Sequence, residues 1–330
     1  MDKTITLGFG KDKTSIIKGI AIIFMIIHHC GSGNVFATFK LCVGIFTFMV
    51  GYGYAFAKVK DWRYSLQHIK KLLIPFWTIL FVFTFPVMYA QGNLGDAKMI
   101  LLNMFGINSV YNYFSWFVAF FIYAMIVMPL IFRFIDRRPI VWTFVFIIFA
   151  YLGEVAVHSI PWWSDNDWTQ RLFDCLLCTP GMLLGYLFAR EGWYTKVKVP
   201  AHWYVTIAAV LLAVVVLVLR HYVGSIAGFN LDFFYAPMFI LPVLIIFNQY
   251  KLSLLTKILM ALGNVSVYMW FFHALFFTKS VSDIYQPLVM VSDSLWIVIP
   301  WTIIITYICS WIIQYIVINL NKMINKFCNV

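Results

Sequence analysis

Long apolar stretches, separated by short polar connections, follow one another along the whole chain. Most are close to the roughly 17–25 residues that an α-helix needs to cross a bilayer. No polar stretch is long enough for a separate soluble domain, so we expect residues 1–330 to form a single transmembrane domain. The pattern predicts an all-α, polytopic membrane protein with about ten transmembrane helices, at residues 15–33, 37–57, 71–90, 113–132, 139–157, 172–189, 203–221, 231–248, 262–278 and 294–318.

Composition excludes a water-soluble protein. Hydrophobic residues make up 63% of the chain and charged residues only 11%, whereas a soluble domain carries about 25% charged residues. The net charge of +11 would suit nucleic acid, but basic residues also collect in the loops on one side of a membrane. We adopt the second interpretation and expect no nucleic-acid partner.

The distribution of basic residues supports this layout. With the N-terminus on the inner side, 19 of the 24 Lys and Arg residues, including Lys3 and Lys251, fall on the inner side. A missed or added span would move every later loop to the opposite side and remove this bias. The bias therefore predicts that both termini are cytoplasmic. The outer side receives the other five: Lys40, Lys98, Arg171, Arg220 and Lys279.

The first predicted span carries three ionisable residues, Lys18, His28 and His29. Lys18 and His29 are eleven residues apart, or three helical turns plus about 20°, so they share a face, whereas His28 lies about 80° away. Their separation of roughly 16 Å places His29 near mid-bilayer if Lys18 marks the cytoplasmic boundary. A neutral imidazole there can act as a general base on a hydroxyl. Alternatively, either histidine simply hydrogen-bonds a neighbouring helix.

Lys70 and Lys71 stand at the predicted inner end of the third span. They can be interfacial anchors whose ammonium groups reach the membrane surface. Alternatively, they surround a cytoplasmic mouth together with Lys18 and hold a phosphorylated ligand.

The ninth predicted span contains Ser266 and His273, which are seven residues apart and therefore lie on one helical face. Because this span also enters from the inner side, His273 is expected at a depth similar to that of His29. The two imidazoles would then share a polar cavity. Taken alone, His273 is better explained as a packed structural residue.

The predicted outer loops combine aromatic and polar residues. Trp162, Trp163 and Trp168 beside acidic residues suit a sugar ring, although tryptophan is also common at membrane interfaces. Arg171 and Asp174 have the spacing of a helix-surface pair, and Glu154 is unexplained unless it faces a cavity or Arg171.

Cys175 and Cys178 form a CxxC at the start of a span, without a second CxxC or a nearby histidine. We therefore expect no metal site. The residues alone leave three classes open: an intramembrane enzyme with a histidine base, a secondary transporter, and a polysaccharide polymerase or flippase.

Six blocks resemble, in order, those of the acyltransferase 3 family of integral-membrane acyltransferases that modify bacterial cell-surface glycans. In the first block, Lys18, Gly19 and His29 match the family's basic residue, glycine and histidine, although the family usually has Arg at the position of Lys18. The blocks are "IKGIAIIFMIIHHC", "VGIFTFMVGYGYAF", "HIKKLLIPF" with Pro75, "WFVAFFIYAMIVMPLI" with Trp116 and Pro129, "RLFDCLLCTPGMLLGYLF" with Arg171 and Gly181, and "LGNVSVYMWFFHALFF" with Gly263, Ser266 and His273.

The resemblance implies a ten-span acyltransferase of the bacterial cytoplasmic membrane. It would move an acetyl or other acyl group from acyl-CoA, as co-substrate and without a bound cofactor, to a hydroxyl of a lipid-linked or surface polysaccharide. The alternative is a membrane transporter or flippase for a glycan or small metabolite. Membrane lipids are expected partners, and the oligomeric state stays open.

The resemblance also suggests roles for individual residues. His29 would be the general base, with His28 beside it, and Ser266 or His273 would orient the acceptor or stabilise the oxyanion. Lys18, Lys70 and Lys71 would bind acyl-CoA. The acceptor side would include Trp116, Glu154 and Arg171.

Overall fold

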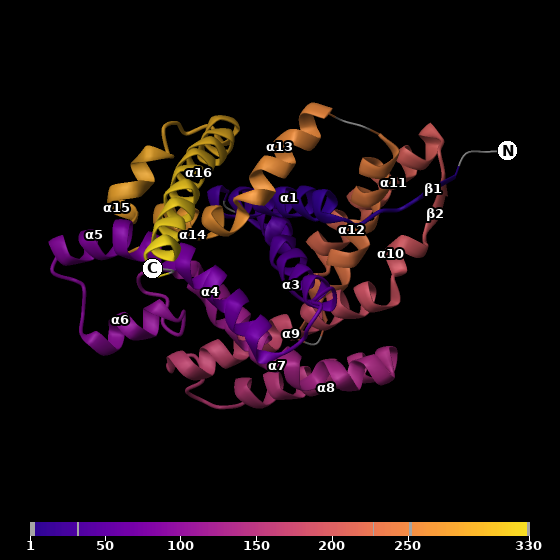
Figure 1. Ribbon diagram of the computed structural model, residues 1–330. Helices are drawn as coiled ribbons and strands as arrows, with labels where there is room; N and C mark the ends of the chain where they lie inside the picture. The colour runs from indigo at the N-terminus through magenta and orange to yellow at the C-terminus, as the bar shows by residue number, and fades with distance from the viewer. Residues whose placement is uncertain (1–3, 32, 227, 251–252, 329–330) are drawn as a thin grey trace. The chain divides into compact units, whose positions relative to one another are not determined.

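The computed structural model describes residues 4–31, 33–226, 228–250 and 253–328, without the side chains of residues 320, 321 and 323–328. Lys3 and Lys251, which the sequence assigned to the inner side, lie outside the described residues. Most of the described chain is helical, and its strands are few and short (Figure 1). This confirms the all-α class predicted from the apolar pattern.

Nine helical segments of the described chain are long and apolar enough to cross a membrane, and each overlaps a predicted span. Several are composite. The second joins α2, η1 and α3, and the third joins α4 and α5 through a π-helical turn, η2, which ends at Thr84, two residues before Pro86. The segments are α1 (Lys11–Cys30), α2 (Asn34–Ala37) with η1 (Thr38–Lys40) and α3 (Leu41–Ala55), α4 (Trp62–Ile79) with η2 (Leu80–Thr84) and α5 (Phe85–Ala90), η3 (Tyr113–Ser115) with α7 (Trp116–Arg137), α8 (Pro139–His158), α9 (Asp167–Glu191), α11 (Trp203–Tyr222), α12 (Asp232–Gln249) and α16 (Leu295–Cys328).

The ninth predicted span is broken. Helices α13 (Ser253–Asn264) and α14 (Ser266–Phe277) pass the same test only as a pair, and they are bent at Val265 into a broken span or a re-entrant loop. The remaining elements are short: α6 (Ala97–Met104), α10 (Trp193–Lys196), α15 (Ser282–Tyr285), η4 (Gln286–Leu288), β1 (Thr4–Thr6), β2 (Lys198–Pro200), β3 (Ser225–Ile226) and β4 (Phe229–Asn230).

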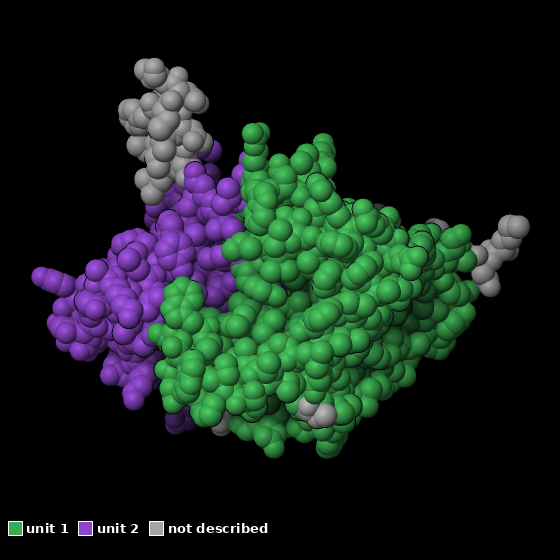
Figure 2. All heavy atoms as spheres, turned by 90° about the horizontal axis from the view of Figure 1, so that it is seen from below, with its two compact units in different colours: residues 1–65, 123–264 green, residues 66–122, 265–330 purple. Residues whose placement is uncertain are grey.

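The chain forms two compact units, shown in separate colours in Figure 2. Unit 1 comprises Met1–Ser65 and Tyr123–Asn264, and unit 2 comprises Leu66–Ile122 and Val265–Val330. Each unit has its own buried aromatic side chains, such as Phe48 and Tyr186 in unit 1 and Phe120 and Phe271 in unit 2. The expected single domain stays a prediction.

Glycines bring α3 and α9 into contact in unit 1. A Cβ added at Gly51 would overlap the backbone of Met182, and one added at Gly185 would overlap the backbone of Phe48. Close backbone approach through small residues is typical of membrane helix pairs. Gly181 faces Thr47 near one end of the pair, and the ring of Tyr54 lies near that of Tyr186 at the other, so α3 and α9 run parallel, as expected for two spans separated by three others.

Segments predicted on the same side of the membrane meet in unit 1. Strand β1 pairs antiparallel with β2, and Gly8 and Asn248 exchange two hydrogen bonds of 3.1 Å. The Lys60 ammonium donates to the Tyr186 hydroxyl at 2.7 Å, which donates to Asp136 at 2.8 Å. All of these segments were predicted to face the inner side, so the predicted sidedness is internally consistent in unit 1.

Candidate functional site

Helix α1 carries Lys18, His28 and His29, all half-buried. The helix begins at Lys11 and ends at Cys30, so His28 and His29 lie in its last turn. The expected mid-membrane depth of His29 stays a prediction, because the bounds of a helix do not locate the membrane surface. The shared face of Lys18 and His29 remains, because both residues belong to one continuous helix.

Gly19, directly after Lys18, fixes the position of α1. A Cβ at Gly19 would overlap the backbone of Leu259 on α13, and one at Gly263 would overlap the backbone of Ser15. Ser15 also donates a hydrogen bond of 2.8 Å to Asn264. The two helices therefore pack backbone to backbone and run antiparallel along this stretch. In the first sequence block, Lys18 thus supplies a positive charge, and Gly19 allows the close packing of α1 against α13.

A backbone contact fixes the protonation of His28. Its Nδ1 lies 3.0 Å from the carbonyl oxygen of Phe36. A carbonyl oxygen only accepts, so Nδ1 carries a proton and donates it, which leaves Nε2 as the basic nitrogen of the neutral ring. The rings of His28 and His29 are in contact, with centroids 4.6 Å apart. Two imidazoles therefore lie side by side at the end of α1, and one has a defined tautomer.

A buried ion pair lies near these histidines. Arg220, at the end of α11, donates to both carboxylate oxygens of Asp232, at the start of α12, at 2.8 and 3.2 Å. The two residues are 8% and 2% exposed, and their charges, with that of Lys40, act on the His28 ring. Sequence reasoning missed this pair. The signal was present as two opposite charges at adjoining ends of consecutive spans.

A second pair lies at the same end of unit 1. Arg171 donates to Asp174 at 2.6 Å, as their spacing predicted. Arg171 is only 7% exposed, so the pair is not an ordinary helix-surface pair. The charge of Lys40 also acts on Asp174. We call Lys40, Arg171, Asp174, Arg220 and Asp232 the outer charge cluster, because all five belong to segments predicted on the outer side.

Glu154 is 7% exposed on α8, the helix that packs along α9. The neighbouring Gly153 faces Leu176 of α9. Glu154 is therefore a buried carboxyl in the helix pair that also carries Arg171. Glu154 was singled out in the sequence because it is a carboxyl group near the end of an apolar span. Its role in the acceptor site stays a prediction.

The other predicted site residues belong to unit 2. His273 is completely buried, stacks on Phe114 with ring centroids 4.7 Å apart, and donates through Nδ1 to the Met269 carbonyl oxygen at 3.2 Å. Ser266 is buried at the start of α14. Trp116 packs edge-on against Trp270, with ring centroids 6.1 Å apart.

The structure thus divides the predicted site residues. Unit 1 contains Lys18, His28, His29, Glu154 and Arg171. Unit 2 contains the rest, with Lys70 and Lys71 exposed. The expected mouth of three lysines and the expected cavity of two histidines each combine residues from both units, so they remain predictions.

Among the described residues, no group of three or more His, Cys, Asp or Glu side chains is arranged to hold a metal ion. Cys175 and Cys178 are buried free thiols. At the end of α1 the structure places two imidazoles beside paired charges.

The fold defines a multi-pass helical membrane protein, and the buried Arg220–Asp232 ion pair of unit 1 joins the ends of two helices. Comparison with known families then gives its class: the acyltransferase 3 family, described as an acyltransferase domain, matches residues 15–315. The chain belongs to this family and is a membrane acyltransferase. No curated protein and no solved structure matches it.

Proposed function

We propose that the protein is an O-acyltransferase that moves an acetyl or other acyl group from acyl-CoA to a hydroxyl of a lipid-linked or surface polysaccharide. One observation carries the proposal. Lys18 and His29 lie on one face of α1, within the matched acyltransferase domain. A cation suited to a phosphorylated donor and a base suited to a hydroxyl are thereby placed on one helix.

His29 acts as the general base in this proposal. Its neutral imidazole takes the proton of the sugar hydroxyl while the oxygen attacks the thioester carbonyl carbon. The tetrahedral intermediate collapses, the carbon–sulfur bond breaks, and the thiolate of CoA leaves. The imidazolium returns the proton to this sulfur, so the products are the sugar ester and free CoA.

Lys18 binds a donor phosphate as a point charge, because an ammonium lacks the bidentate fork of the arginine that the family usually has. The exposed Lys70 and Lys71 are proposed as further phosphate contacts. Trp116, Glu154 and Arg171 are proposed on the acceptor side. Ser266 is proposed to orient the acceptor or stabilise the oxyanion, because His273 has no exposed surface and is stacked on Phe114.

His28 has a supporting role in this proposal. Its Nδ1 is committed to the Phe36 carbonyl, and its ring packs on His29. These contacts hold the neighbouring imidazole in place. Nε2 of His28 is chemically able to accept a proton too, but only His29 shares the helical face of Lys18.

We place the protein in a bacterial cytoplasmic membrane with both termini in the cytoplasm. The excess of basic residues in the predicted inner loops supports this orientation. The donor would reach Lys18 from the cytoplasm, and the acceptor would approach from the side of the outer charge cluster.

The test compares cells whose own gene is deleted and which produce either the native chain or His29→Ala. The acetyl content of the surface glycan is measured by NMR, with the amount of protein in the membrane as control. We expect the acetyl esters to disappear in His29→Ala while insertion is unchanged. Unchanged acetylation would refute the mechanism.

A second measurement separates the enzyme from a transporter. Acyl-CoA binding should raise the thermal stability of the purified full-length protein. If millimolar CoA changes nothing and vesicles containing the protein move a glycan without consuming acyl-CoA, the transporter interpretation replaces the proposal.

A further inference from the structure

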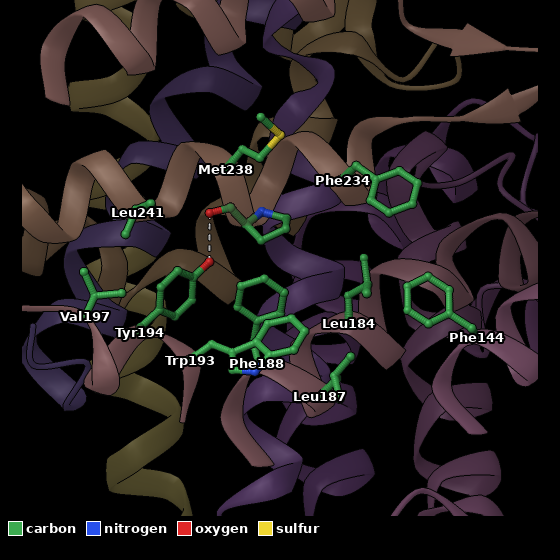
Figure 3. Close-up of a pocket in the computed structure, with 11 residues that line it drawn as sticks. Phe144, Leu184, Leu187, Phe188, Trp193, Tyr194, Val197, Phe234, Met238 and Leu241 are labelled. Atoms are coloured by element: carbon green, nitrogen blue, oxygen red, sulfur yellow. Dashed lines mark hydrogen bonds between the residues drawn. The ribbon is translucent and has the colours of Figure 1, made fainter. Parts of the chain in front are cut away.

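An apolar groove of about 370 Å³ lies on unit 1, outside the residues discussed so far. Its walls come from α8, α9 and α12 and from the segment that follows α9 (Figure 3). The lining extends from residues 193–197 to Phe234, in the first turn of α12. The groove is therefore elongated along the helices, and its volume lies within the roughly 300–1,000 Å³ typical of ligand sites.

The groove offers hydrocarbon contacts and almost no polar ones. Leu184, Leu187 and Phe188 of α9 line it. The Tyr194 hydroxyl points at the Pro237 carbonyl oxygen and donates to it at 2.9 Å (Figure 3). Burial raises the pKa of Tyr194 well above its ordinary value, so the hydroxyl stays a neutral donor. The lining therefore suits an extended apolar chain and not a sugar or a nucleotide.

The mouth of the groove opens sideways from the helices. Phe144, Phe234 and Met238 are 42%, 38% and 44% exposed, and they belong to candidate membrane spans. In a spanning segment, exposed apolar side chains face lipid. The occupant can therefore enter from the bilayer.

Two lysines flank the last lining residue at one end of the groove. Val197 lines the groove between Lys196 and Lys198, and both lysines are exposed. Lys198 belongs to β2, which pairs with the N-terminal strand β1. This end therefore lies on the side of unit 1 that we propose to face the cytoplasm. Juxtamembrane lysines there attract anionic lipids, at about 1 kcal/mol each.

We infer that the groove binds an anionic phospholipid from the cytoplasmic leaflet, with one acyl chain along the apolar lining and the head group at Lys196 and Lys198. The inference goes beyond acyl transfer and does not depend on the role of His29. It uses only the proposed orientation.

Photo-crosslinking of the full-length protein in vesicles tests the inference. The vesicles consist of unlabelled phosphatidylcholine and a trace of one probe lipid. The probe is either phosphatidylglycerol or phosphatidylcholine, and each probe carries a diazirine on one acyl chain. Mass spectrometry then maps the adducts. We expect them on the groove residues, with phosphatidylglycerol giving at least about a fivefold higher yield, as the attraction of one lysine provides.

Paired variants separate the two parts of the site. Met238→Trp narrows the mouth and should remove most groove adducts, whereas Leu211→Trp, at an exposed position of α11, should not. Replacing both lysines (Lys196→Gln with Lys198→Gln) should abolish the head-group preference but keep the adducts. Lys58→Gln, on another exposed inner segment, is the matched charge control.

Three outcomes would overturn the inference. Equal labelling of the groove and the exposed face of α11 would mean that the groove is ordinary lipid-facing surface. Equal adduct yields from the two probes would show that the groove does not prefer an anionic head group. If groove adducts are missing and cross-links between chains show that a second copy of the chain covers the groove, the occupant is a protein and not a lipid.

Discussion

The histidines at the end of α1 and the histidine of α14 are the same residue type in opposite surroundings. His28 and His29 are half-buried in the last turn of a helix, and charges of the outer charge cluster act on His28. His273 has no exposed surface, stacks on Phe114, and uses its Nδ1 proton within its own helix. An imidazole therefore gains a chemical role from access and polar neighbours, and the presence of a histidine in an apolar stretch is not sufficient.

The largest effect should come from replacing the proposed base. His29→Gln keeps a polar side chain but removes the titrating nitrogen, so the rate of acyl transfer should fall by about 10²–10⁴-fold. The release of free CoA from acetyl-CoA in the presence of the glycan acceptor measures this rate. A loss of less than about tenfold would mean that another group is the general base. His29 and His273 would then not differ in their role in the reaction.

The buried ion pair should dominate the stability of this region. Arg220→Met leaves Asp232 as an unpaired buried charge and should lower the free energy of unfolding by about 3–5 kcal/mol. The double variant Arg220→Met with Asp232→Leu should recover much of that loss, and Arg133→Met, at an exposed position, is the control. Thermal unfolding measures all three. Equal stability of the two arginine variants would show that the pair is not a structural element of the cluster.

His273→Phe tests the packed side of the comparison. An aromatic ring is kept and the hydrogen bond to the Met269 carbonyl oxygen is lost, so the free energy of unfolding should fall by about 0.5–1.5 kcal/mol. Acyl transfer should stay within a few-fold of the native rate. An activity loss as large as that of His29→Gln, with stability unchanged, would instead make His273 a residue of the reaction.

The smallest effect is expected for His28→Ala. This change removes the ring that packs on His29 but leaves the face of Lys18 and His29 intact, so the rate should fall by less than about tenfold, since a lost general base costs more. Steady-state rates of both histidine variants, measured side by side, decide the assignment. The reverse order would make His28, with its basic Nε2, the general base.

The sequence predicted most of the fold. Apolar length located nine of the ten predicted spans, because each span must be long enough to cross the bilayer. Their ends agree to within about five residues, except that the third begins at Trp62 and not at residue 71. The break at Val265 was not predicted. Residues 253–264 were treated mainly as a connection, although Leu259 and Leu262, three residues apart, form a buried helical face.

The candidate site was predicted only where it lies within one helix. Lys18 and His29 could be related by helical phase alone. The Arg220–Asp232 pair and the contact from His28 to Phe36 depend on how separate segments pack, and the spacing of residues within one helix carries no such information. The close approach at Gly19 could likewise be seen only with α13 in place.

Chemical rescue of His29→Gly tests the central claim most directly. A small external imidazole can occupy the space left by the side chain and supply the missing basic nitrogen, so added imidazole should restore part of the acyl-transfer rate, in proportion to its concentration. Lys18→Ala, which lacks the proposed phosphate contact but keeps the base, should not respond. The predicted result is that imidazole rescues His29→Gly but not Lys18→Ala. If His29→Gly folds and binds CoA but imidazole leaves its rate unchanged, or if it is as active as the native enzyme without imidazole, the assignment of His29 as the general base is contradicted.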